Sequence, residues 1–150
     1  MKLRLALAML VVSIAASLAV AAPAVAASSH WTKHHAARLY LHDVRPSNRE
    51  LDRWDKLAKS TLNLGALRKE AGRVADSEMV FVQRLIRGNW APHVDKAMKK
   101  LEVRVLNEVR QWQRIAAAGT IKQLQHAITN LPRGSQAANN VRRSLGLPTV

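Results

Sequence analysis

Apolar residues recur every three or four positions over most of this chain, which is the spacing of one face of an α-helix. The clearest run begins near Pro92 and ends before Gly119, and its apolar positions are Met98, Leu101, Val105, Val109, Trp112 and Ala116. Proline suits the first turn of a helix, and glycine is favoured just past its end. The pattern therefore predicts a long amphipathic helix over 92–118 with this apolar face in a core.

A second long helix is predicted before it, ending at Gly88. Its apolar stripe consists of Ala71, Val74, Ala75, Met79, Val82, Leu85 and Ile86. A stripe of this width is typical of a helix that packs against a core. A break over 61–65 separates it from the preceding segment.

Two shorter helical pieces are predicted on either side of Pro46. Their apolar positions are Ala36, Ala37, Tyr40, Leu41 and Val44 in the first, and Leu51, Trp54, Leu57 and Ala58 in the second. The residue before a proline disfavours the helical conformation, so the first piece should stop or kink at Arg45. Ser47 and Glu50 have the spacing of a capping box, which predicts a new helix start.

The C-terminal segment predicts two further helices. Thr120 and Gln123 form a second capping-box pattern that opens a helix over 120–131, and Ser135 could begin a short one that reaches Leu145. No stretch has the alternating pattern of a strand. We therefore expect an all-α fold, most simply an antiparallel up-and-down bundle of about four main helices.

The N-terminal segment has the pattern of a secretory signal peptide. Lys2 and Arg4 precede an apolar run over 5–20, and small residues around Ala26 follow Pro23. We expect cleavage after Ala26, or one residue later, rather than a transmembrane helix. Pro23 would end such a helix early, and Ala24-Val25-Ala26 presents small side chains at the positions that a signal peptidase reads. The expected organisation is a signal peptide over 1–26, an arm over 27–35 and one helical domain over 36–150.

The excess of positive charge indicates which kind of partner the protein binds. The chain has 24 Lys and Arg against 10 Asp and Glu, a formal net charge of +14, and removal of Lys2 and Arg4 with the leader lowers this excess by two. Glu108 is the last acidic residue, and the unopposed cations after it are Arg110, Arg114, Lys122, Arg133, Arg142 and Arg143. For an exported protein we expect these cations to bind an anionic envelope polymer or lipid surface, and no nucleic acid. The alternative is that the positive charge only maintains solubility.

Two stretches resemble small exported helical proteins and lipoproteins of actinobacteria. The first is Tyr40-Leu41-His42-Asp43-Val44-Arg45-Pro46-Ser47-Asn48-Arg49-Glu50-Leu51, and the second runs from Leu85 to Val94 with Trp90 and Pro92 before a long helix. The resemblance implies a helical fold and an exported location, and no assigned activity. Many members carry a lipid-bearing cysteine after the signal, whereas this chain has no cysteine.

Histidines near the expected mature start suggest a metal site. Imidazoles suit Zn, Cu and Ni, and the candidate ligands are Ser28, Ser29, His30 and His34. If the mature chain begins at Ser28, its amine, two backbone amides and the His30 imidazole could surround Cu(II) in a square plane. The alternative is a solvated arm without a metal.

The carboxylates and tryptophans give no catalytic pattern. Glu70, Asp76, Glu78, Asp95, Glu102 and Glu108 lack the Glu-x-x-His pairs of a di-iron bundle, and we interpret them as surface charges. Trp54 and Trp112 lie on apolar stripes and should be core residues. Trp31 and Trp90 should pack at helix ends, or else stack on a ligand ring.

The sequence thus predicts a secreted, non-catalytic helical-bundle protein without a cofactor. Two other functions stay open at this point: extracellular metal capture by the N-terminal histidines, and regulation or inhibition of another exported protein by the helical domain.

Overall fold

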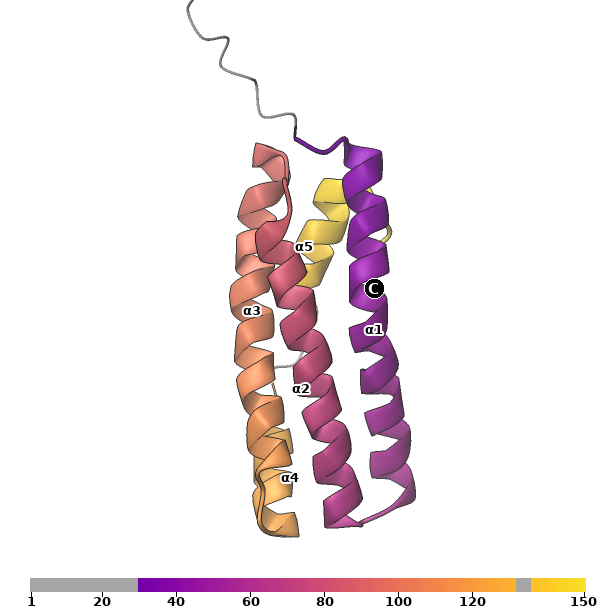
Figure 1. Cartoon of the computed structure of the whole chain (residues 1–150), viewed down its shortest axis with the longest axis vertical. Helices are drawn as coiled ribbons and strands as arrows, with labels where there is room; N and C mark the ends of the chain where they lie inside the picture. Colours follow the sequence, from indigo (N-terminus) through magenta and orange to yellow (C-terminus); the bar gives the residue numbers. More distant parts are fainter. Residues whose placement is uncertain (1–29, 132–135) are drawn as a thin grey trace, which may run out of the picture.

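The computed structural model describes residues 30–131 and 136–150, and this part of the chain is built from helices (Figure 1). The five helices are α1 (Lys33–Ser60), α2 (Leu64–Arg87), α3 (Pro92–Ala116), α4 (Ile121–Thr129) and α5 (Gln136–Leu145). Within the described ranges there is no strand, so the all-α prediction is confirmed. The expected signal peptide lies outside the described residues.

Helix α3 is the element around which the others are arranged. It packs against α2, α4 and α5, while α1 packs against α2 and α5. Figure 1 shows α1, α2 and α3 side by side along the long axis, with α4 near the C-terminal end of α3 and α5 nearer its N-terminal end. Residues of α1, α2, α3 and α5 therefore converge on a shared interior.

The predicted apolar face of α3 is confirmed. Met98, Leu101, Val105, Val109 and Trp112 are all buried, together with the neighbouring Val94 and Ile115. The Trp112 ring meets that of Trp54 edge to face, with ring centroids 5.0 Å apart. Both indoles are thus core residues, as their places on the apolar stripes predict.

The stripe of α2 is shifted from its predicted position. Ala71, Val74, Ala75, Val82 and Leu85 are buried as expected. Ile86, however, is 60% exposed, and Phe81 and Glu78 occupy the inner face instead. The prediction for Ile86 was wrong because hydrophobicity alone assigned the stripe, and a buried glutamate does not contribute to such a pattern.

Helix α1 continues through Pro46, so the predicted break and restart were wrong. The buried residues Tyr40, Ser47 and Trp54 are seven positions apart and share one face of the helix. The packing of this face outweighs the one backbone hydrogen bond that Pro46 cannot donate. Ser47 consequently lies in the middle of the helix, only 3% exposed, and does not cap a helix start.

The capping prediction at Thr120 is confirmed with one change. The Thr120 hydroxyl accepts a hydrogen bond from the Gln123 N–H at 3.2 Å. The Gln123 side-chain oxygen accepts from Gly119 N–H, at 2.8 Å, instead of from the N–H of the cap residue. At the start of α1, Thr32 accepts from His35 N–H, so α1 begins within the predicted arm.

Trp90 closes the loop between α2 and α3. Its indole N–H donates to the Leu85 carbonyl at 2.7 Å, and its ring meets Trp31 edge to face at 4.9 Å. A Cβ at Gly88 would lie 2.2 Å from the Trp90 ring, so glycine is required there for close approach. Trp31 and Trp90 therefore pack at a helix end, as predicted.

Among the described helices, none combines the length and the apolar character needed to span a membrane.

Candidate functional site

The predicted anion-binding residues lie in two regions of the fold. Arg110 and Arg114 are exposed on α3, and Lys122 is exposed in the first turn of α4. Arg142 and Arg143 are on α5, which packs against α1 and α3, and Arg133 lies outside the described residues. The structure brings Arg114 and Lys122 together, since both line a shallow groove at the junction of α3 and α4.

The outer face of α3 extends this positive region along the bundle. Its positions are Lys96, Lys100, Val103, Asn107, Arg110 and Arg114, which follow steps of three and four residues and are all exposed. We call the four cations of this face, Lys96, Lys100, Arg110 and Arg114, the basic stripe. At 1.5 Å per residue, the stripe is about 27 Å long. Lys96 and Lys100 were not among the predicted anion-binding residues because that prediction covered only cations after Glu108, although their helical period is readable in the sequence.

Four arginines after Glu108 lie in the described ranges, and they bind neutral acceptors. Arg110 donates to Asn107 Oδ1 at 3.2 Å, and Arg114 donates to Gln111 Oε1 at 3.4 Å. On α5, Arg142 donates to the Pro148 carbonyl and Arg143 to Asn140 Oδ1. In the described ranges, no ion pair includes any of these four arginines.

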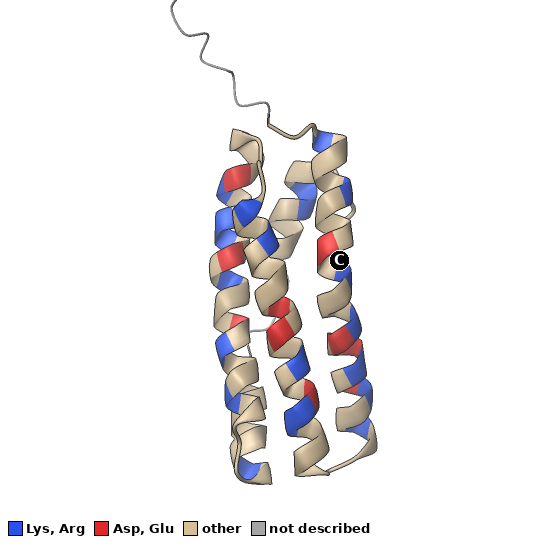
Figure 2. Ribbon diagram, viewed as in Figure 1, with Lys and Arg blue, Asp and Glu red and all other residues tan. Residues whose placement is uncertain are grey.

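In the described part of the chain before Arg110, several arginines and lysines form ion pairs with carboxylates. These pairs are Arg53–Glu50, Arg73–Glu70, Arg84–Asp43, Lys99–Asp95 and Arg104–Glu108. Figure 2 shows blue segments on every helix, with red segments beside them on α1, α2 and the upper part of α3. The positive field of the C-terminal third is consequently less neutralised than that of the rest of the bundle.

The predicted metal site falls only partly within the structure. Ser28 and Ser29 lie outside the described residues, and His30 and His34 are exposed. The His30 Nδ1 atom lies 3.1 Å from the Asn89 side-chain oxygen. Among the described side chains, no group of three or more His, Asp or Glu residues could hold a metal ion. A site at the N-terminus would depend on the backbone around Ser28.

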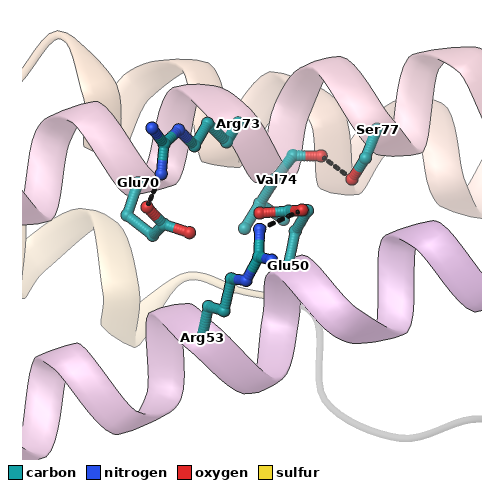
Figure 3. Close-up of polar contacts among 6 residues, drawn as sticks. All are labelled: Glu50, Arg53, Glu70, Arg73, Val74 and Ser77. Carbon is teal, nitrogen blue, oxygen red and sulfur yellow. Dashed lines mark hydrogen bonds and ion pairs between the residues drawn. The ribbon is translucent and has the colours of Figure 1, made fainter.

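Two carboxylates that the sequence analysis assigned to the surface are buried, so that assignment was wrong. Glu70 is 8% exposed and Glu78 is 4% exposed. Glu70 is paired with Arg73 at 2.9 Å. Figure 3 shows this pair near the matching Glu50–Arg53 pair of α1. Glu70 is thus stabilised by a cation of its own helix, whereas no ion pair of Glu78 occurs within the described part of the chain.

Glu78 lines a cavity of about 160 Å³ between α1, α2, α3 and α5. The other polar side chains of its wall are Tyr40, Ser47, Asn48, Arg104 and Glu108. Burial raises the pKa of Glu78 to about 8, the negative charge of Glu108 adds to this increase, and a hydrogen bond with Trp112 opposes it. Arg104 donates to Glu108 at 2.5 Å, so Glu78 is the carboxylate of this wall without a paired cation.

A comparison of the chain with models of protein families, with curated proteins and with solved structures finds no match. The basic stripe and the cavity around Glu78 are therefore the two features of the molecule that indicate a function.

Proposed function

We propose that this chain is a secreted, non-catalytic binding protein that associates with anionic polymers of the cell envelope through the basic stripe of α3. The proposal includes the cleavable leader over 1–26 and an antiparallel arrangement in which α4 and α5 together form the fourth arm of the bundle. The observation that carries it is a row of exposed cations on one helix face, none of which is in an ion pair in the described part of the chain.

The geometry of the stripe suits a linear polyanion. Lys96 and Lys100 are one turn apart, as are Arg110 and Arg114, so two pairs of cations lie at the two ends of the face. Lys122 and the groove beside Arg114 continue the positive surface beyond the end of α3. A polymer with phosphates along its length could contact both pairs at once, and each contact would add to the others. Arginine is well suited to phosphate because its guanidinium donates two parallel hydrogen bonds.

The outer face of α1 provides an internal control. Arg45, Arg49, Lys56 and Lys59 are also exposed and also follow helical spacing. Unlike the stripe, this face contains an acidic residue, Asp52, in the middle of the row. Replacement of four cations on either face removes the same formal charge from the protein. The two variants therefore separate a local site from the effect of net charge.

The test measures binding to long-chain polyphosphate and to isolated wall polymer. The stripe variant carries Lys96→Gln, Lys100→Gln, Arg110→Gln and Arg114→Gln, and the control carries Arg45→Gln, Arg49→Gln, Lys56→Gln and Lys59→Gln. Near an anionic surface each cation contributes about 1 kcal/mol, so we expect at least a tenfold loss of affinity in the stripe variant and a smaller loss in the control.

Salt provides the second readout. The Debye length falls from about 30 Å at 0.01 M to about 3 Å at 1 M, so binding of the unmodified protein should weaken steeply over this range. Equal losses of affinity in the stripe variant and the control would show that binding depends on the net charge of the protein and not on the basic stripe. Retention of binding at 1 M salt would refute the electrostatic proposal.

A further inference from the structure

We propose that the cavity between α1, α2, α3 and α5 binds a small primary amine with a compact apolar body. This inference is independent of the polymer-binding proposal, because the cavity is formed by the inner face of α3 and the basic stripe lies on its outer face.

Two side chains of the cavity wall carry buried polar atoms without partners among the described residues. Glu78 Oε2 and Ser47 Oγ are inaccessible to solvent, and neither has a hydrogen-bond partner among the described residues. Both side chains line the cavity, one from α2 and the other from α1. A buried polar group without a partner destabilises a fold, so such groups call for an explanation. An ammonium group bound in the cavity would supply the hydrogen-bond donor that these side chains lack.

The charges of the cavity wall also favour an amine. The charged groups of the wall are the carboxylates of Glu78 and Glu108 and the guanidinium of Arg104. Arg104 is bound to Glu108, which leaves Glu78 as the one wall carboxylate without an opposite charge in an ion pair. A cationic ligand would provide that charge when Glu78 ionises, whereas an anionic ligand would meet a guanidinium that is already bound to Glu108.

The size and the lining of the cavity suit a compact apolar body. A volume of about 160 Å³ is close to that of the engineered apolar cavities of about 150 Å³ that bind benzene. Phe81, Leu101 and Val105 supply apolar walls on the side of α2 and α3, and Val44 and Leu51 supply them on α1. The site therefore fits a body of about six carbon atoms that carries one amine.

The raised pKa of Glu78 gives the binding a defined pH dependence. The titratable and charged groups that face Glu78 are Tyr40 from α1 and Arg104 and Glu108 from α3, while α5 contributes the neutral Ala137 and Ala138. A bound ammonium favours ionised Glu78, so an amine that is already charged must displace the proton of the carboxyl group. Amine affinity should therefore rise as the pH increases from 6 to 8.

The probe is benzylamine, compared with benzyl alcohol, toluene and benzoate, in calorimetric titrations of the full mature chain. We expect benzylamine to bind at least tenfold more tightly than benzyl alcohol, and benzoate not to bind. Glu78→Gln should remove the preference for the amine, and Ser47→Ala should weaken amine binding. Glu70→Gln is the matched control, because Glu70 is also buried but does not line the cavity.

The Ala138→Leu variant tests whether the probes bind inside the cavity. Ala138 is a half-buried wall residue, and three added carbon atoms would reduce the cavity and weaken all probes that bind there. Helix content and melting temperature establish that each variant is folded. Equal binding of all four probes, no binding of benzylamine, or unchanged amine preference in Glu78→Gln would overturn the proposal and leave a water-filled cavity. Polymer binding should be unaffected by Glu78→Gln, which separates this test from that of the basic stripe.

Discussion

The inner and outer faces of α3 use charge in opposite ways. On the inner side, Arg104 and Glu108 form a close ion pair beside the apolar core, and both side chains are largely shielded from water. On the outer side, Lys96, Lys100 and Arg110 are exposed and belong to no ion pair in the described part of the chain. Water screens an exposed charge, whereas a shielded one requires a partner.

In our two proposals, this difference gives each face its own kind of recognition. The inner face would select a ligand through one carboxylate, Glu78, because burial makes a single charge strongly dependent on its partner. The outer face would bind through the number and spacing of its cations, because each exposed contact contributes little. Substitutions on one face should therefore leave the behaviour of the other almost unchanged.

The largest expected effect is on the core side of α3. Leu101 is 4% exposed, and Leu101→Ala should lower the free energy of unfolding by about 2–5 kcal/mol, because it leaves a void in a packed interior. Val103, two residues away, is 62% exposed, and Val103→Ala should change the stability by less than about 0.5 kcal/mol. Urea unfolding of both variants measures the difference. A loss below about 0.5 kcal/mol for Leu101→Ala would contradict the assignment of the inner face.

A smaller effect is expected from the titration of Glu78. Its pKa is about 8 in the folded protein, against an ordinary value of 4.5, so the folded state retains a proton that the unfolded chain releases. This contribution to stability is complete below pH 4.5 and is lost as the pH rises to about 8. Between pH 5 and 7 the free energy of unfolding should therefore fall by about 2–3 kcal/mol more in the unmodified protein than in the Glu78→Gln variant.

Denaturant unfolding at several pH values measures this loss. The Glu78→Gln variant is the reference, because it keeps every titratable group of the protein except Glu78. The groups that face Glu78 are Tyr40, Arg104 and Glu108, and they are unchanged in this variant. Parallel stability curves for the two proteins would contradict a raised pKa for Glu78.

The helices themselves could largely be predicted from sequence, because their signals are local. The apolar period of α3 and the Thr120 cap depend on residues within a few turns of each other, and both are confirmed. The break at Pro46 was predicted on equally local grounds and was wrong. There the burial of Tyr40 and Trp54 on one face of α1 outweighs the preference of the proline.

The cavity could not be predicted, because it depends on contacts between helices distant in sequence. A glutamate in a helix is usually exposed, so Glu78 was assigned to the surface. Its environment is made by Ser47 of α1 and Glu108 of α3, and no local pattern places these residues together. The basic stripe was missed for a different reason, since the positions of Lys96 and Lys100 in the helical period were available in the sequence.

The smallest expected effect concerns the stability of the outer face. Lys96 and Lys100 are like charges four residues apart on α3, as are Arg110 and Arg114. Each such pair destabilises a helix by about 0.2–0.5 kcal/mol, so the stripe variant with four glutamines should be more stable by about 0.5–1 kcal/mol at low salt. The gain should disappear at 1 M salt, where exposed charges are screened. Thermal unfolding at low salt and at 1 M salt measures this gain. If the stripe variant instead lost more than about 1 kcal/mol of stability, the stripe would have a structural role, and the two faces of α3 would not act independently.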